Sequence, residues 1–286
     1  MTTDADPGRG SRILGDLKGS GGGQRSVWIA LASTLVFAGI LVALIVTSPG
    51  WPAVKASFFN RKIFFDSLPE IAHAFLLNIR IFLTAEVFIL VFALLIAVLR
   101  GLPGPVFFPI RGLAIAYTDF FRGVPTILVV YILGFGAPAL QLSWLEWATP
   151  LFWGTLALVL VYSAYVAEVY RAGIESVHTS QEAAARSLGL SRLKTLRYVI
   201  VPQAVRRVIP PLLNDFIGLT KDTALVAFLG PVEAFRQSQI DVAATFNYTP
   251  YMCAALLFVL LTIPLARLTD WLVARERKRQ LAGGAR

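Results

Sequence analysis

Long apolar stretches separated by shorter polar segments run through this sequence. A helix needs about 20 mainly apolar residues to cross the hydrocarbon core of a bilayer. Val27–Thr47 meets this requirement with no charged residue inside it. The other stretches of sufficient length are Ile71–Leu99, Val124–Leu142, Pro150–Val169, Val208–Leu229 and Pro250–Leu268. We therefore expect an all-α polytopic membrane protein with about six transmembrane helices.

Composition agrees with this pattern. Of the 286 residues, 56% are hydrophobic and 15% are charged, whereas about 25% of the residues in an average soluble domain are charged. The net charge of +9 would suggest a nucleic-acid partner if the protein were soluble. In membrane proteins, however, Lys and Arg gather in the cytoplasmic segments and set the orientation of the chain. We therefore expect membrane lipid around this chain and no nucleic acid.

Basic residues cluster in the N-terminal tail, in Gly173–Arg207 and in the C-terminal tail. With six helices these segments fall on one side of the membrane, which predicts that both termini are cytoplasmic. The connections Gln141–Thr149 and Gly230–Thr249 fall on the other side and are poor in basic residues. Ser48–Glu70 fits this rule less well, because this outer loop carries Lys55, Arg61 and Lys62.

The chain is predicted to fall into successive parts. Residues 1–26 are rich in Gly, Ser and charge and are expected to form a disordered cytoplasmic tail. Residues 27–70 are expected to form an N-terminal transmembrane helix and an external loop. The helix is longer than the apolar core of a signal peptide, so we interpret it as a retained anchor. Residues 71–272 form the transmembrane core, and residues 273–286 form a basic cytoplasmic tail.

The charged segment after the fourth span predicts two short helices joined by a tight turn. Thr179 and Glu182 have the spacing of a capping box, with Thr179 as the N-cap of the first helix. Gly189 is placed to end this helix, because glycine accepts the left-handed conformation that other residues resist.

The second helix is predicted over Arg192–Val201. Ser191 is placed to cap its start, and Pro202 is expected to end it. Pro210 and Pro211 then mark the expected start of the fifth span. The segment as a whole is a basic helix–turn–helix between two membrane helices.

This segment resembles the EAA signature of ABC importer permeases through Glu182-Ala183-Ala184, Gly189 and Pro202. Further segments look like the polar-amino-acid uptake branch of that family: Phe121–Pro125, Ala164–Ile174, Val201–Ala204 and Lys221–Leu225. The resemblance covers about Ile71–Leu272. The sequence departs from the family's pattern in its additional N-terminal helix and in Ser180, which stands where we expect Gly.

The resemblance implies a permease subunit in the bacterial inner membrane that pairs with a second permease subunit, either another copy or a paralogue. It also implies a cytoplasmic ABC ATPase dimer, which binds ATP and Mg, and an extracytoplasmic solute-binding protein. No cofactor is expected in this chain. The loop would dock on the ATPase through Glu182, Ala183, Ala184, Gly189, Leu190 and Pro202. Simple structural roles for Glu182 as a helix cap and Gly189 as a helix stop are compatible with docking.

Ionisable residues inside membrane helices are costly and are therefore candidates for function. In the fifth span a polar stripe at helical spacing should face the protein interior; it consists of Asn214, Asp215, Gly218, Lys221 and Asp222. Glu86 is alone on the second span. Glu86 and the stripe form either a solute pathway or an interhelical packing network, and Lys221 could meet Glu86 directly or across bound solute. Glu168 is expected to pair locally with Arg171.

We therefore expect an importer permease for polar amino acids, with glutamate, glutamine and basic amino acids as candidates. The alternative is an ion-coupled secondary transporter, but such proteins often show inverted repeats with broken helices, and no such repeat is found. A membrane-embedded hydrolase is disfavoured because HExxH and GxSxG motifs are missing from the sequence. A GxxxxGK[ST] phosphate loop is also missing, so ATP hydrolysis must lie on another subunit. The single cysteine, Cys253, excludes a Cys-based metal site.

Overall fold

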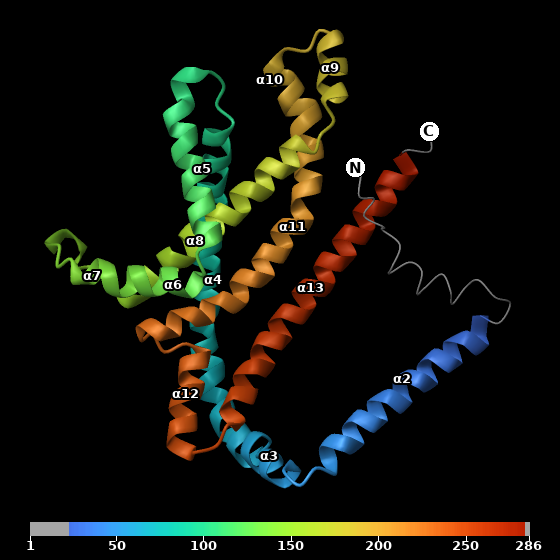
Figure 1. The fold of residues 1–286 in the computed structure, drawn as a ribbon, viewed down its shortest axis with the longest axis vertical. Coiled ribbons are helices and arrows are strands. Elements are labelled where there is room, and N and C mark those ends of the chain that lie inside the picture. The colour runs from blue at the N-terminus through green and yellow to red at the C-terminus, as the bar shows by residue number, and fades with distance from the viewer. Residues whose placement is uncertain (1–22, 284–286) are drawn as a thin grey trace. The chain divides into compact units, whose positions relative to one another are not determined.

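The computed structural model describes residues 23–283, and every regular element in this range is helical. Most of the predicted disordered tail, residues 1–26, lies outside the described residues. The chain divides into two compact units, Met1–Ser57 and Phe58–Arg286. Figure 1 shows the order of the helices along the chain.

The first unit contains α2, Gly23–Val46, and nearly all of α3, Trp51–Phe58. Residues 27–46 of α2 are long and apolar enough to cross a membrane, in agreement with the first predicted span. The Ser33 and Thr34 hydroxyls donate to the carbonyl of Ala30, so these polar groups are satisfied within the helix, as a lipid environment requires. The predicted loop Ser48–Glu70 is wrong in part, because α3 and the first turns of the next helix occupy most of it.

The second unit is built on α4, Arg61–Arg100. Asn60 caps its start by accepting from the amides of Lys62 and Ile63. Its 40 residues span about 60 Å, twice the thickness of a bilayer core. α8, Pro150–Glu175, packs along the second half of α4, and the core between them includes Ala85, Ile89, Ala157, Leu158 and Val161.

The predicted span Val124–Leu142 follows a sharp bend between two helices. After the short turn η1, Pro105–Phe107, the helix α5 runs over Phe108–Gly123, and the chain then bends by 107° before α6, Thr126–Tyr131. The bend falls at Pro125, which has no amide hydrogen to continue the helix. Helical structure continues through the π-turn η2, Ile132–Gly136, and α7, Ala137–Ala139; η3, Ser143–Leu145, then leads to α8.

The predicted fifth span, Val208–Leu229, is not a single helix. α11, Val201–Asp222, ends inside it, and the chain continues as the 3-10 helix η5, Thr223–Leu229. Pro210 and Pro211 lie within α11 rather than at the start of a span. The described residues contain 4 helices that could cross a membrane, or 5 spans if the bent pair is counted. α11 is not among them because charged and amide side chains interrupt its apolar residues.

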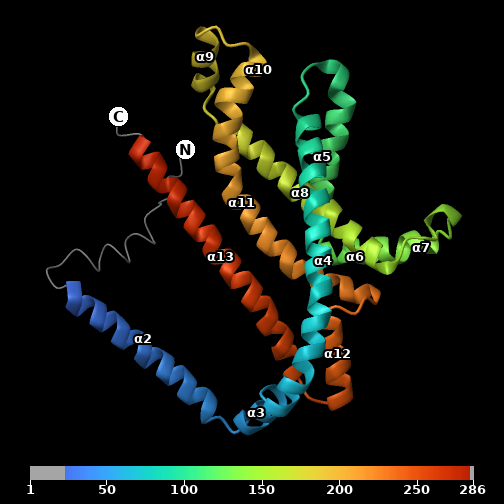
Figure 2. The ribbon, with the colours of Figure 1, turned by 180° about the vertical axis from the view of Figure 1, so that it is seen from behind.

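The last two helices meet the first half of α4, and α13 then runs away from α4, as both ribbon views show (Figures 1 and 2). α12, Ala234–Thr245, and the start of α13, Thr249–Gly283, pack on the first half of α4. The small core here includes Phe75, whose ring meets that of Phe258 edge-on at 5.0 Å. α13 extends well past the predicted span Pro250–Leu268, so most of the predicted tail 273–286 is helical.

Candidate functional site

A helical hairpin projects from one end of the second unit (Figure 1). It consists of α9, Thr179–Ser187, and α10, Arg192–Thr195. Gly189 joins them with φ +84°, and the amide of Leu190 donates back to the carbonyl of Ala185 at 3.2 Å. Ser191 caps α10, with its hydroxyl accepting from the amide of Lys194 at 3.5 Å. The predictions for Gly189 and Ser191 are confirmed.

The predicted N-cap of the first hairpin helix is wrong by one residue. His178 takes the extended cap conformation, and its Nδ1 accepts from the amide of Ser180 at 3.2 Å. Thr179 is therefore the first helical residue. Glu182 lies in the first turn of α9, where its carboxylate faces the positive end of the helix dipole instead of closing a capping box. An imidazole nitrogen thus takes the place of the Ser or Thr hydroxyl that usually caps a helix.

The predicted end of the second hairpin helix at Pro202 is also wrong. α10 continues through the π-turn η4, Leu196–Ile200, directly into α11. Pro202 is the second residue of α11 and directly follows this π-turn, so the helix continues through a residue that has no amide hydrogen to donate. The hairpin is thus continuous with the helix that carries the polar stripe.

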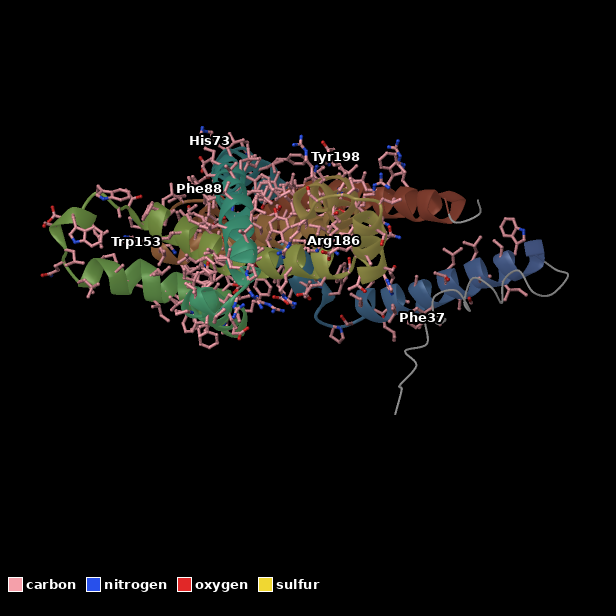
Figure 3. The ribbon with its side chains drawn as sticks, turned by 90° about the horizontal axis from the view of Figure 1, so that it is seen from above. Phe37, His73, Phe88, Trp153, Arg186 and Tyr198 are labelled. Carbon is pink, nitrogen blue, oxygen red and sulfur yellow. The ribbon has the colours of Figure 1, made fainter. Side chains whose placement is uncertain are left out.

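The hairpin exposes apolar side chains to its surroundings. Leu188 is 84% exposed and Leu193 is 79% exposed. Arg186 of α9 is also exposed, as is Tyr198, which lies just after α10 (Figure 3). Of the residues predicted to dock, Glu182 and Leu190 are half-buried, and the exposed ones are Ala183, Ala184, Gly189 and Pro202. Exposed leucines flanked by arginines form a surface suited to another protein.

An ion-pair network holds the adjacent helix ends together. The Glu168 carboxylate on α8 accepts from Arg100 Nη1 of α4 at 2.8 Å, and it also pairs with Arg171. Arg122 Nη1, at the end of α5, lies 3.9 Å from the same carboxylate. The predicted local pair Glu168–Arg171 is confirmed, and the structure adds two arginines from other helices.

Farther along α11, the structure brings part of the predicted stripe against side chains of two other helices. Tyr162 of α8 donates its hydroxyl to Asp222 Oδ2 at 3.0 Å. A Cβ at Gly218 would lie 3.1 Å from the Tyr162 hydroxyl oxygen, so glycine leaves room for this contact. The ring of Phe82 on α4 meets that of Phe216 on α11, and Glu86 of α4, like Asp215, is half-buried. Tyr162 was missed because nothing in its local sequence distinguishes it from a core aromatic.

Two members of the stripe face outward. Asn214 and Lys221 are exposed on this chain. Among the residues that the structure describes, Lys221 makes no ion pair within 4.0 Å. The direct pair between Lys221 and Glu86 that the sequence left open is therefore not formed within the chain. In addition, the buried Oδ2 of Asp215 finds no hydrogen-bond donor among the described residues.

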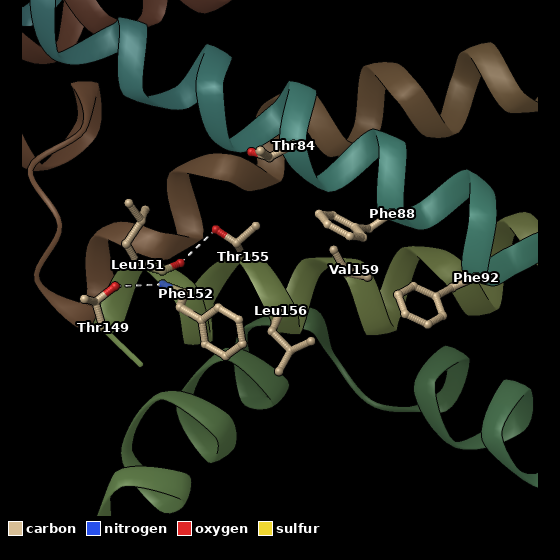
Figure 4. A pocket seen from close by; sticks show the side chains of 9 residues that line it. All are labelled: Thr84, Phe88, Phe92, Thr149, Leu151, Phe152, Thr155, Leu156 and Val159. Carbon is tan, nitrogen blue, oxygen red and sulfur yellow. Dashed lines mark hydrogen bonds between the residues drawn. The ribbon is translucent and has the colours of Figure 1, made fainter. Parts of the chain in front are cut away.

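A separate groove lies between α4 and α8 (Figure 4). It has a volume of about 410 Å³ and contains no charged side chain; its lining is Thr84, Phe88, Phe92, Thr149, Leu151, Phe152, Thr155, Leu156 and Val159. The Thr84 and Thr155 hydroxyls donate to the carbonyls of Arg80 and Leu151, and the Thr149 hydroxyl accepts from the amide of Phe152. Since all of these threonine hydroxyls are engaged locally, the groove offers little to a polar solute.

Long apolar helices with half-buried carboxylates, joined to a hairpin with exposed leucines, fit a membrane transport subunit. The chain belongs to the family described as the binding-protein-dependent transport system inner membrane component, which matches residues 106–278. It is a transport subunit of the ABC type and not an enzyme.

Individual relatives agree with this assignment. The probable glutamine ABC transporter permease GlnM of Bacillus subtilis is 35% identical over 60% of this chain and 79% of its own length. The glutamate transport system permease GluC of Corynebacterium glutamicum is 33% identical over 70% of this chain and 91% of its own length. A crystal structure of an amino acid ABC transporter with histidines has 30% identity and a TM-score of 0.66, covering 73% of this chain and 94% of its own.

Proposed function

We propose that this chain forms the translocation path of an ABC importer for polar amino acids. The observation that carries the proposal is that the half-buried carboxylates Asp215 and Asp222 lie on α11, the helix that leads directly into the projecting hairpin. The relatives named for glutamine and glutamate, and the solved amino acid transporter, support a substrate of this class.

The pathway is built from Glu86 on α4 and from the stripe on α11. A zwitterionic amino acid needs an anionic partner for its ammonium group and a cationic partner for its carboxylate. The carboxylates of Asp215 and Asp222, with Glu86, provide the first, and the exposed ammonium of Lys221 provides the second. Three carboxylates against one lysine favour neutral or basic amino acids over acidic ones, because like charges in a desolvated site repel each other strongly.

The hairpin is the docking element for a cytoplasmic ATPase. Its exposed Leu188 and Leu193, with the turn at Gly189, form the contact surface. Since η4 joins the hairpin to α11 without a loop, a displacement of the hairpin by the ATPase moves the pathway helix as well. The hairpin therefore lies in the cytoplasm, and both termini lie on the same side of the bacterial inner membrane, with α11 and η5 crossing as a sixth, less apolar span.

The full transporter contains further subunits. A second permease subunit covers the face that carries Lys221 and Asn214, because an unpaired ammonium at membrane depth is costly next to lipid. An ATPase dimer binds ATP and Mg, and an extracytoplasmic binding protein delivers the amino acid.

The proposal is tested by competition in proteoliposomes that contain this chain with its ATPase and binding protein. Uptake of labelled arginine, glutamine and glutamate is measured separately, each against unlabelled competitors. We expect uptake of arginine or glutamine to exceed that of glutamate. Preferential glutamate uptake would contradict the charge argument, and failure to move any amino acid would contradict the substrate class.

A further inference from the structure

A buried carboxylate lies outside the pathway, at the start of α12. Glu233 has 0% of its surface exposed. Its Oε1 accepts from the amide of Arg236 at 2.8 Å, and its Oε2 accepts from the amide of Phe235 at 3.0 Å. Burial raises the pKa of the Glu233 carboxyl above its ordinary value, and these donors oppose that effect. Glu233 is thus the N-cap of α12.

The partner of this carboxylate is Asn78, in the middle of α4. Asn78 is 2% exposed, and both polar atoms of its amide are bonded. Its Nδ2 donates to Glu233 Oε2 at 2.7 Å and to Thr223 Oγ1 at 3.1 Å, and its Oδ1 accepts from the amide of Ala234 at 3.1 Å. One side chain on α4 therefore binds both the first residue of η5 and the start of α12.

The choice of Glu at this cap is informative. Asn, Asp, Ser and Thr are the preferred N-caps, because their short side chains fold back on the first turn. Any of them would cap α12 alone. The longer side chain of Glu233 caps the helix and also reaches α4, at the cost of burying a carboxylate that then requires several donors.

These contacts bracket the segment that breaks the pathway helix. Thr223 directly follows Asp222, where α11 ends. At the other end of η5, Gly230 has φ +112° and turns the chain toward Glu233. The segment is thus held by Asn78 at its start and, through Glu233 and Ala234, just beyond its end.

We propose that Asn78, together with Glu233, is a positioning residue that fixes the break between α11 and η5 and so sets the Asp222 carboxylate against Tyr162. This inference rests on the proposed function, since it assigns Asp222 to the solute pathway. It predicts that loss of the Asn78–Glu233 contact weakens solute binding by the permease while the hairpin and the rest of the bundle keep their structure.

The test swaps the amide of Asn78 and the carboxylate of Glu233 between the two positions. Asn78→Asp places two carboxylates together, and Glu233→Gln places two amides together. The double variant restores one amide facing one carboxylate, because the carboxylate introduced on α4 can accept from the amide of Ala234 and from the amide side chain introduced at the cap. It does not restore the bond to Thr223 Oγ1, because a carboxylate cannot donate and the Thr223 hydroxyl already donates to the carbonyl of Thr220. Ser238→Ala is the matched control, because this buried hydroxyl on α12 donates to the carbonyl of Ala234 and not to Asn78 or Glu233.

Each variant is reconstituted with its ATPase and binding protein, and uptake is measured with whichever of arginine, glutamine or glutamate the wild type transports best. We expect each single variant to raise the apparent KM about tenfold, as the loss of a hydrogen bond to a buried charge implies, with a smaller change in kcat. Hydrogen exchange of residues 223–229 should rise in the single variants. The double variant should recover part of both effects, since only the contact with the start of α12 is restored, and Ser238→Ala should show neither.

The inference would be overturned if the single variants had the same hydrogen exchange and the same KM as Ser238→Ala. It would also be overturned if the double variant recovered neither the KM nor the hydrogen exchange of the single variants. Asp222→Asn is measured in parallel. If Asp222→Asn transports with an unchanged KM, the proposed pathway is wrong, whatever the hydrogen exchange of residues 223–229 shows. If Asp222→Asn is impaired while Asn78→Asp transports normally, the positioning role of Asn78 fails and the pathway stands.

Discussion

Single side chains decide how closely α8 and α11 approach each other. Gly173 of α8 is buried, and a Cβ added there would overlap Cγ2 of Val208 on α11. Gly173→Ala should therefore reduce the free energy of unfolding by about 1–3 kcal/mol through overpacking. Adding Val208→Ala should recover part of this loss, because it removes the methyl groups that clash. Thermal unfolding in detergent measures both, and a Gly173→Ala variant as stable as the wild type would contradict the close approach.

Glu86 and Lys221 are expected to act independently of each other. The structure shows no ion pair for Lys221 among the described residues, so removing both charges should not rescue the loss of one. We predict that Glu86→Gln and Lys221→Met each lower uptake and that their double variant shows no recovery in uptake or in thermal stability. Recovery in the double variant would instead mean that the two groups are buried partners, whose separation costs about 3–5 kcal/mol.

The turn between α9 and α10 depends on a backbone conformation that few residues adopt. Gly189 has φ +84°, and a β-branched residue there costs about 1–3 kcal/mol in strain. Gly189→Val should still insert in the membrane but lose solute-stimulated ATP hydrolysis, because the docking surface is distorted. Gly189→Asn is the control, since Asn tolerates the left-handed region. Normal transport by Gly189→Val would remove the basis for the docking assignment.

The hairpin illustrates which local features can be predicted. Gly189 and Ser191 were identified from sequence because turn and cap preferences depend on single residues. The cap at His178 was missed because imidazole is an uncommon N-cap acceptor. Pro202 was taken as a helix end because proline has no amide hydrogen to donate within a helix, and the sequence gives no sign of the π-turn that precedes it in the continuous helix.

Across the second unit, the apolar spans within α4, α8 and α13 could be predicted from the sequence. The residues by which these helices extend beyond the predicted spans could not. The break after Asp222 interrupts a predicted span, because packing against other helices decides where such a segment turns, whereas the bend at Pro125 falls at the start of a predicted span. Tyr162 meets Asp222 across 60 residues of sequence, and Asn78 meets Glu233 across 155. A single sequence carries no signal for contacts at that separation.

The distribution of basic residues predicts the membrane topology. With the hairpin in the cytoplasm, a reporter fused after Arg279 should be cytoplasmic, and a tag between Trp144 and Trp147 should be accessible from outside. Accessibility of both sites to a membrane-impermeant reagent, before and after permeabilisation, distinguishes the two sides. A cytoplasmic result for the Trp144 tag would contradict the orientation.

The central claim is that this chain moves an amino acid only when a separate ATPase drives it. The most direct measurement is uptake of labelled arginine and glutamine into proteoliposomes that hold the chain and the binding protein, with or without the ATPase and ATP. We predict uptake that requires both the ATPase and ATP and that is insensitive to imposed proton or sodium gradients. Uptake driven by an ion gradient without the ATPase would contradict the account and favour an ion-coupled transporter.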